Sequence, residues 1–330
     1  MGRQVSFGIA EELFRLSITY GDEGRYPENW LDGKGTRTEN DPRFEVKYNP
    51  QTFAILAEQL LMREGVDIMY GTYIVDAVTR DQRIESLMAV NKSGHTRYYV
   101  KSVVDATGDC DVAHFVNAEC ATYQQGNVLA AWSYFAGQDG YRLCTHGYAD
   151  IPDEERTGKG EYLIDRRFTG LSGKELSEMM MLSHEQMLNK YLSEKEKDPT
   201  LALATIPTIP QIRMTRKIVG KYTLTYAEMH TYMEDSIGMV SNWKKRGPVW
   251  EVPFGTLVCA DVKNLFVSGR CTSVDERLWD VMRVIPCCAV TGQAAGIAAA
   301  ISDEFSCVDI SLLQKRLKEN GVILHEKDLL

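Results

Sequence analysis

The first clear hydrophobic pattern in the chain is helical and covers residues 50–64. Apolar side chains recur there at intervals of three and four residues, at Phe53, Leu56, Ala57, Leu60 and Leu61. Asn49 and Pro50 suit the N-cap and the first helical position, and Gly65 is a typical stop signal. The spacing therefore predicts an amphipathic helix between Pro50 and Gly65.

After Gly65 the hydrophobic pattern changes to a period of two, which is typical of strands. It predicts a short buried strand and three further strands, at 66–70, 72–78, 84–90 and 98–104. Turn residues lie between them at 80–82 and at 91–94. A helix, a buried strand, a meander and a final apolar strand form an order that is expected to end at the edge of a parallel sheet.

The middle of the chain mixes charged and aromatic residues, as in a domain that lies over a site. It predicts a helix at 173–196 and a strand-like tract at 211–224. The last part returns to the first pattern, with an apolar strand, a helix of small residues and an amphipathic helix, at 264–270, 289–301 and 311–320. We therefore expect an α/β protein in three segments, 1–139, 140–255 and 256–330.

Composition narrows the functional classes. The net charge is −9, and no group of Lys and Arg stands clear of acidic neighbours, so a nucleic acid is not an expected partner. No apolar run approaches the roughly 18 residues of a spanning helix, and the expected location is cytoplasmic. The eight cysteines lack CxxC-type spacing, so we expect no metal site and no disulfide framework.

Two apolar strands end in similar glycine turns about 160 positions apart. The first reads Val-Val-Asp-Ala-Thr-Gly-Asp at 103–109, and the second Asn-Leu-Phe-Val-Ser-Gly-Arg at 264–270. Glycine lets the backbone approach a ligand closely at the carboxyl end of a sheet, where open α/β folds bind cofactors. Taken singly, each motif could equally be a strand that ends in an ordinary turn. Together they indicate one sheet that the chain visits twice.

A third motif, Ala-Val-Thr-Gly-Gln-Ala-Ala-Gly at 289–296, begins a helix of small residues. Such a helix can pack against backbone or a flat ligand, and its positive N-terminal end can stabilise the negative charge of a reduced flavin. An Ala-rich packing helix is the alternative. Cys287 and Cys288 precede the motif, where a helix N-terminus can lower a thiol pKa, although small-residue packing is the favoured interpretation.

These three motifs resemble, in the same order, those of FAD-dependent oxidoreductases of the glutathione-reductase-type fold, in the group related to heterodisulfide reductase flavoprotein subunits. An arginine-bearing stretch at 211–220 and the turn at 252–257 resemble the same family. The resemblance runs from about residue 5 to the end. It implies an FAD/NAD(P)-binding Rossmann-like domain with an inserted α+β domain on the substrate side, over residues 140–255.

The resemblance also implies roles for individual residues. The cofactor-binding candidates are Thr107, Gly108, Asp109, Gly269, Arg270, Thr291, Gly292 and Gln293. The last three would lie at the edge of the isoalloxazine ring. Arg213 and Arg216 are the catalytic candidates, as fixed cations on the substrate side, with surface ion pairs as the alternative. Some members of the family carry iron–sulfur clusters, but this chain lacks the cysteine run that such clusters need.

The sequence departs from the family in one respect. The strand, GxGxxG turn and helix that bind the dinucleotide are not found, so we expect the first βαβ unit, about 30 residues or more, to be missing. Either the chain is truncated or a partner chain supplies the unit. Two hypotheses follow: a flavoenzyme that acts through FAD on a small organic molecule, incomplete as this chain alone, or a non-catalytic remnant or subunit.

Overall fold

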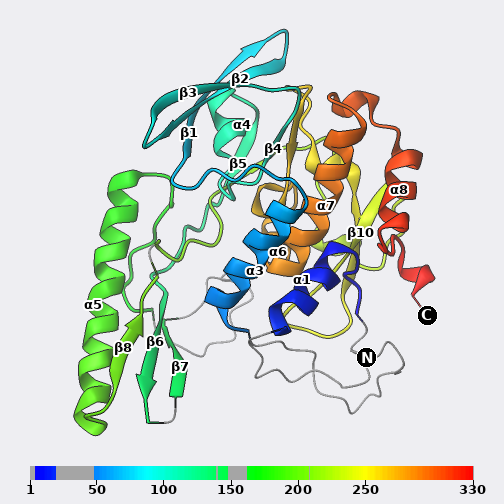
Figure 1. Ribbon diagram of the computed structural model, residues 1–330. Coiled ribbons are helices and arrows are strands. Elements are labelled where there is room, and N and C mark those ends of the chain that lie inside the picture. The colour runs from blue at the N-terminus through cyan, green and yellow to red at the C-terminus, as the bar shows by residue number, and fades with distance from the viewer. Residues whose placement is uncertain (1–3, 20–47, 139, 148–161, 208, 330) are drawn as a thin grey trace. The chain divides into compact units, whose positions relative to one another are not determined.

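The computed structural model of the protein describes residues 4–19, 48–138, 140–147, 162–207 and 209–329 (Figure 1). The chain forms two compact units. Unit 1 combines Met1–Cys120 with Lys217–Leu330, and unit 2 is Ala121–Arg216. Residues 121–139 belong to unit 2, and residues 217–255 belong to unit 1. The boundaries of the two units therefore differ from those of the predicted segments.

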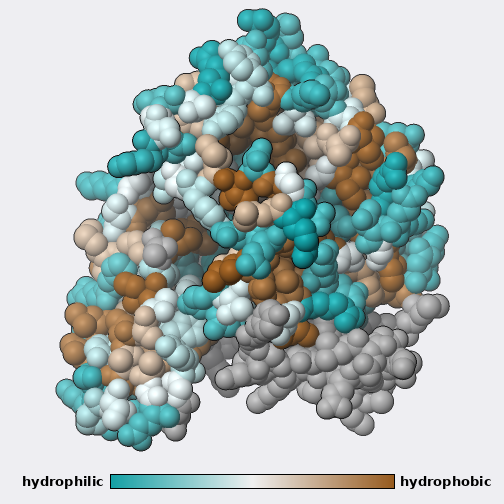
Figure 2. All heavy atoms as spheres, viewed as in Figure 1, coloured by the Kyte–Doolittle hydropathy of each residue, from teal (hydrophilic) through white to brown (hydrophobic). Residues whose placement is uncertain are grey.

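The first helices among the described residues of unit 1 are α1 (Ile9–Ile18) and α3 (Pro50–Arg63). The predicted start of α3 is confirmed, because the Asn49 side chain accepts hydrogen bonds from the backbone N–H groups of Gln51 and Thr52. No residue of α3 is fully buried. Apolar side chains reach the surface near α3 on the face seen in Figure 2, and Ile55 and Met62 are among the exposed ones.

The predicted meander is present as three antiparallel strands in the order β1 (Tyr73–Arg80), β2 (Arg83–Asn91) and β3 (Gly94–Tyr99). Asp81 and Gln82 both have positive φ angles in the first hairpin turn, the geometry that suits the twist of a two-residue connection. The turn at 91–94 is also confirmed, with Gly94 at a φ of 99°.

Two strand predictions in this region are wrong. Residues 98–104 do not form one strand, because β3 ends at Tyr99 and β4 (Val103–Asp105) belongs to a different sheet. Residues 66–70 form no strand, and they pair with no strand among the described residues. Val66, Met69 and Tyr70 are exposed, so the apolar pattern of this segment does not mark a buried position here.

The expected return to one sheet is confirmed by β4 and β12 (Leu265–Val267), which pair in parallel with Leu265 opposite Val103 and Val267 opposite Asp105. Buried Asn264 joins this pair to the meander. Its amide oxygen accepts from the Ile84 N–H at 2.8 Å, and its amide nitrogen donates to the carbonyl oxygens of Ile84 and Lys101. Segments 180 residues apart are thus fixed side by side in the core of unit 1.

The rest of the described part of unit 1 consists of a hairpin, four helices and several short 3-10 turns. The hairpin and helices are β10 (Ser236–Ser241), β11 (Val249–Pro253), α4 (Asp111–Phe115), α6 (Glu276–Met282), α7 (Ile285–Ile301) and α8 (Ile310–Glu319). The 3-10 turns are η2 (Tyr226–Glu228), η3 (Phe254–Leu257), η4 (Gly269–Cys271), η5 (Phe305–Cys307) and η6 (Glu326–Asp328). Figure 1 shows α7 running beside the β4–β12 pair, and α7 contacts both strands.

Unit 2 contains a three-stranded antiparallel sheet in the order β7 (Gly140–His146), β6 (Ala131–Gly137) and β8 (Ala202–Thr205), together with α5 (Gly173–Lys197). The helix predicted at 173–196 is therefore confirmed. Its Met179 packs with Leu129 and Phe168 in a buried cluster. The chain passes between the units through β5 (Cys120–Thr122) and β9 (Arg216–Ile218), which pair as a two-stranded sheet.

The strand predicted at 211–224 is confirmed only over β9. Residues before it are irregular because buried Asn127 satisfies their backbone. Its side-chain oxygen accepts from the N–H groups of Arg213 and Met214, and its nitrogen donates to the Met214 carbonyl. In the described part of the chain no single helix has the length and composition to span a membrane, although α6 and α7, bent by 89°, meet these two criteria as a pair.

Candidate functional site

The parallel pairing of β4 and β12 brings the two glycine turns together at the carboxyl ends of both strands. A pocket of about 440 Å³ lies there. Its lining comes from the first turn, the second turn, and the segment from Arg283 to α7: Ala106, Thr107, Gly108, Ser268, Gly269, Arg270, Arg283 and Cys288. The volume is in the range of small-molecule sites, and the position is the one where open α/β sheets bind ligands.

The first turn is held by the buried carboxylate of Asp105. One oxygen accepts from the N–H of Thr107 at 3.1 Å and from its hydroxyl at 2.7 Å. The other accepts from the Ala113 N–H in α4 at 3.1 Å. The Thr107 hydroxyl in turn accepts from the Asp111 N–H at 3.0 Å. The Thr107 side chain is therefore part of the turn, and the residue contributes to the lining of the pocket.

Gly108 allows the turn to pass close to Arg270. Its φ is 81°, a value that residues with a Cβ rarely adopt, and a Cβ there would lie 2.7 Å from the Arg270 guanidinium. Asp109 follows, and its carboxylate pairs with Arg270 at 2.9 Å. The first turn thus gives Arg270 both the space and the counter-charge that fix its position against the pocket.

The second turn is held by residues from helices. The Gly269 N–H donates to the Thr291 hydroxyl of α7 at 2.9 Å, and that hydroxyl donates back to the Cys287 carbonyl. The indole N–H of Trp279 in α6 donates to the Arg270 carbonyl at 2.8 Å. Gly269 has a φ of 64°. The sequence predicted that Thr291 binds the cofactor. In the structure its side chain is fully buried and holds the second turn through the Gly269 N–H.

Sequence reasoning missed Arg283 as a lining residue of the pocket. It lies between α6 and α7, and its guanidinium pairs with the fully buried carboxylate of Asp280 at 2.5 Å. Only the i,i+3 spacing of Asp280 and Arg283 along the sequence could have indicated such a pair. Cys288 also lines the pocket. Burial raises the pKa of its thiol, and the positive charges of Arg270 and Arg283 act in the opposite direction.

A comparison with known protein families shows the family to which the chain belongs. The model of the family described as FAD dependent oxidoreductase matches residues 1–131 and 128–317. The chain belongs to the FAD-dependent oxidoreductase family. Among curated proteins none matches the chain.

Several solved structures are similar to this family member at low sequence identity. A geranylgeranyl bacteriochlorophyll reductase-like protein from Thermoplasma acidophilum is 9% identical, with a TM-score of 0.40, over 87% of this chain and 62% of the other. The p-nitrophenol 4-monooxygenase from Pseudomonas putida is 10% identical, with a TM-score of 0.38, over 86% of this chain and 58% of the other. A myxobacterial chondrochloren halogenase is 14% identical, with a TM-score of 0.39, over 96% of this chain and 69% of the other. The chain spans less than two thirds of the length of the first two.

The cofactor of this oxidoreductase family is FAD. Gly292 and Gly296 lie on α7, and a Cβ built on either meets no heavy atom within 4 Å. The surface of α7 is therefore open at these two glycines. The glycine turns bring backbone to the pocket, and Arg270 brings a cation to it, which suits a ligand with phosphate or carbonyl oxygens.

The other sequence candidates lie in different places. Gln293 of α7 is half-buried, and its side-chain oxygen accepts from the Ile9 N–H at 3.0 Å, so it holds the start of α1. Neither Gln293 nor Gly292 lines the pocket. Arg213 and Arg216 belong to unit 2, so their place relative to the pocket stays a prediction. The structure thus brings together Thr107, Gly108, Gly269 and Arg270, with Asp109 paired to Arg270.

All eight cysteines are free thiols. Cys110 and Cys271 follow the two turns and contact each other, since the Cys110 N–H donates to the Cys271 sulfur at 3.1 Å. Both are fully buried, and burial strongly raises the pKa of Cys110. Within the described residues, no group of three or more His, Cys, Asp or Glu side chains could hold a metal ion.

Proposed function

We propose that this chain acts, alone or as part of a larger assembly, as an FAD-dependent oxidoreductase on a small organic substrate. The observation that carries the proposal is the convergence of Gly108, Gly269 and Arg270 on one pocket at the carboxyl ends of paired parallel strands. The family match supports the same reaction class and does not favour the alternative of a non-catalytic remnant or subunit. A cytoplasmic location remains part of the proposal.

Each element of the pocket has a physical role in this proposal. When bound, FAD supplies a two-electron acceptor and donor. Asp105 keeps the first turn in the conformation that exposes its backbone to the ligand. Asp109 orients the Arg270 guanidinium, whose planar donors suit phosphate or carbonyl oxygens. Thr291 fixes Gly269 against α7, so the second turn cannot move away from α7 without breaking that bond.

We also propose that the fold is of the glutathione-reductase type, in the group related to heterodisulfide reductase flavoproteins, and that a glycine-rich βαβ unit completes it. This unit would come from the same polypeptide or from a partner chain. Two features support the proposal. No strand pairs with the second edge of β4 among the described residues, and the apolar segment 66–70 has no strand partner there either. Sheets most often have about 4–6 strands, more than the two that pair here.

The inserted region keeps its predicted role as a substrate-side domain. Unit 2 interrupts the two segments that form the pocket, and it carries Arg213 on a backbone anchored by Asn127. Arg213 and Arg216 remain the proposed cations on the substrate side. Gly292 and Gln293 remain proposed neighbours of the ring edge, the first because of the open space beside it and the second by the family resemblance.

Visible absorption and thermal unfolding of the purified chain with FAD test this function. For residues 1–330 alone we expect weak binding, no bound yellow chromophore and no resolvable shift in Tm at micromolar FAD. With a glycine-rich βαβ unit added, we expect a flavin spectrum and a rise in Tm of about 2–4 °C at a hundredfold excess over Kd. Arg97→Gln, on exposed β3, is the control, and Arg270→Gln should weaken binding.

Two outcomes would contradict different parts of the proposal. If the completed protein binds no FAD, the flavoenzyme function is wrong. If residues 1–330 alone purify with stoichiometric FAD, the function stands and the requirement for an added unit is wrong.

A further inference from the structure

Lys217 is a buried amine that lies beside Trp279, the residue whose indole N–H holds the second turn. It belongs to β9, and it is the first residue of unit 1 after the inserted unit 2. Only 8% of the residue is exposed. Burying a charged amine is costly unless other groups stabilise it. The partners of Lys217 therefore indicate its role.

Two groups contact the amine of Lys217 directly. Its Nζ donates to the carbonyl oxygen of Val274, and it lies over the ring of Trp279, 5.2 Å from the ring centre. A cation within about 6 Å of an aromatic ring is attracted to it, and the attraction is stronger where water is excluded. Trp279 is fully buried. The two side chains thus form a cation–π pair inside unit 1.

Acidic residues near Lys217 favour its charged form. Burial lowers the pKa of the amine, and the charges of Glu276 and Asp275 at the start of α6 act in the opposite direction. Cys110, which follows the first turn, also acts to raise this pKa. The two carboxylates therefore offset part of the cost of burying the charge beside the indole ring.

Trp279 connects the amine to the pocket. Its indole N–H donates to the carbonyl oxygen of Arg270 at 2.8 Å, and Arg270 lines the pocket. Lys217 is held from the other side, because its neighbour Ile218 is fully buried in the same core cluster as Val267 of β12. A displacement of the indole ring would therefore change the hydrogen bond that fixes the second turn.

We propose that Lys217 is a positioning residue, which holds the indole ring of Trp279 so that its N–H fixes the Arg270 carbonyl in the second turn. The strand by which the chain returns to unit 1 is thereby coupled to the cation of the pocket. The consequence for FAD rests on the proposed function, whereas the positioning itself is measured without flavin.

The indole N–H of Trp279 reports directly on this contact. We would label the tryptophans isotopically, follow hydrogen exchange of their indole N–H groups by NMR, and assign the Trp279 signal with Trp279→Phe. In Lys217→Met we expect exchange at Trp279 to become about tenfold faster, because the ring loses its cationic partner. The indole N–H of Trp250 donates to the Tyr226 carbonyl at 3.1 Å, and its exchange should not change.

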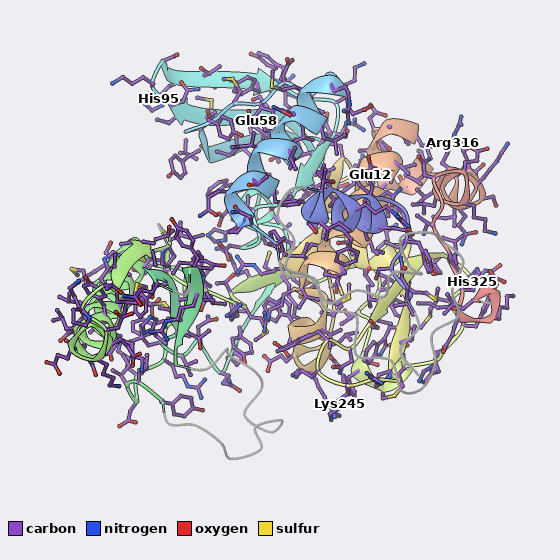
Figure 3. All side chains as sticks on the ribbon, turned by 60° about the horizontal axis from the view of Figure 1, so that its bottom comes forward. Glu12, Glu58, His95, Lys245, Arg316 and His325 are labelled. Atoms are coloured by element: carbon purple, nitrogen blue, oxygen red, sulfur yellow. The ribbon has the colours of Figure 1, made fainter. Side chains whose placement is uncertain are left out.

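Two further variants remove a lysine charge elsewhere in unit 1. Lys221→Met is the matched control, since Nζ of Lys221 also lies over a ring, 4.3 Å from the centre of Phe305. Lys245→Met changes an exposed lysine in the loop between β10 and β11, and Figure 3 shows Lys245 pointing away from the core of unit 1. Both variants should leave the exchange at Trp279 unchanged.

Conservative variants separate the charge of Lys217 from its hydrogen bond. Lys217→Arg keeps a cation that can lie over the ring, and it should restore most of the protection at Trp279. Lys217→Gln keeps a donor for the Val274 carbonyl but carries no charge, so it should resemble Lys217→Met. It also provides the test if Lys217→Met does not fold. Restoration by Gln and not by Arg would mean that only the hydrogen bond matters, which would overturn the proposal.

The effect should reach the second turn and leave the first turn unchanged. The Thr272 N–H donates to the Gly269 carbonyl at 3.2 Å within the second turn, and its exchange should become faster in Lys217→Met. The Ala113 N–H donates to Asp105, which holds the first turn, and its exchange should not change.

The proposal is overturned if exchange at Trp279 is unchanged in Lys217→Met and Lys217→Gln, or if it rises equally at Trp250, since the effect is then a general loss of stability. In the chain completed with a βαβ unit, Lys217→Met should raise the Kd for FAD about fivefold, because Arg270 lines the pocket. An unchanged Kd would overturn the coupling to the pocket. If the completed protein binds no FAD, the proposed function fails and the exchange measurements still decide the role of Lys217.

Discussion

The two glycine turns that form the pocket have nearly the same sequence design but are stabilised differently. The turn after β4 is held within ten residues by Asp105, whose carboxylate bonds to Thr107 and to the start of α4. The turn after β12 depends on α6 and α7, through Trp279 and Thr291. One turn is therefore built by its own local sequence, and the other by tertiary contacts.

This difference assigns separate tasks to the two turns. The locally held turn supplies a rigid platform, Gly108, and a counter-charge, Asp109. The other turn supplies the cation, Arg270, and its position depends on how α7 packs against the sheet. A disturbance of the packing of α7 should therefore reach the cation first and leave the platform in place.

The largest expected effect is at the centre of the local turn. Asp105→Ala removes the acceptor of three hydrogen bonds and leaves the buried Ala113 N–H without its partner. We expect the free energy of unfolding to fall by about 3 kcal/mol, because hydrogen bonds to a buried charge are among the stronger ones. Urea unfolding measures it, with Asp76→Ala on exposed β1 as control. A loss no larger than that of the control would show that the turn is not held locally.

Alanine at the two glycines should sharpen the comparison. Gly108→Ala adds the cost of a positive φ to a contact with the Arg270 guanidinium, for a total of about 2 kcal/mol. Gly269→Ala meets only the Cys288 sulfur at 3.3 Å and should cost about 1 kcal/mol. Gly65→Ala is the control, since its φ is 76° and its surroundings are open. Equal losses at all three positions, again by urea unfolding, would mean that the approach of Gly108 to Arg270 has no energetic consequence.

The smallest effect is expected where α7 holds the second turn. Thr291→Val keeps the shape of the side chain but deprives the buried Gly269 N–H of its acceptor, which should cost about 1 kcal/mol. Thr79→Val on exposed β1 is the control. Urea unfolding of the variant and of the unaltered chain would measure the loss of stability. Hydrogen exchange of the Gly269 amide should also become faster in the variant. Unchanged exchange at Gly269 would argue that another group satisfies its N–H.

Local patterns explain the parts of the fold that could be predicted. The meander and its turns, the start of α3 at Pro50 and the length of α5 follow from alternation, capping residues and helical spacing within a few residues. The segment 66–70 could not be predicted, because an apolar extended segment is a buried strand only where a neighbouring strand pairs with it. The same limit applies to 211–215, where Asn127 replaces a strand partner.

For the candidate site, the sequence by itself determined the chemistry of each turn: glycine where φ must be positive, Asp109 and Arg270 beside it, and the small residues of α7. These are local requirements of backbone conformation and charge. Only the tertiary structure decided that the parallel pairing of β4 and β12 joins the two turns, that Thr291 and Gln293 hold other segments, and that Arg283 lies at the pocket. Such contacts join residues up to 284 positions apart, and no local pattern encodes which of many possible partners packing will select.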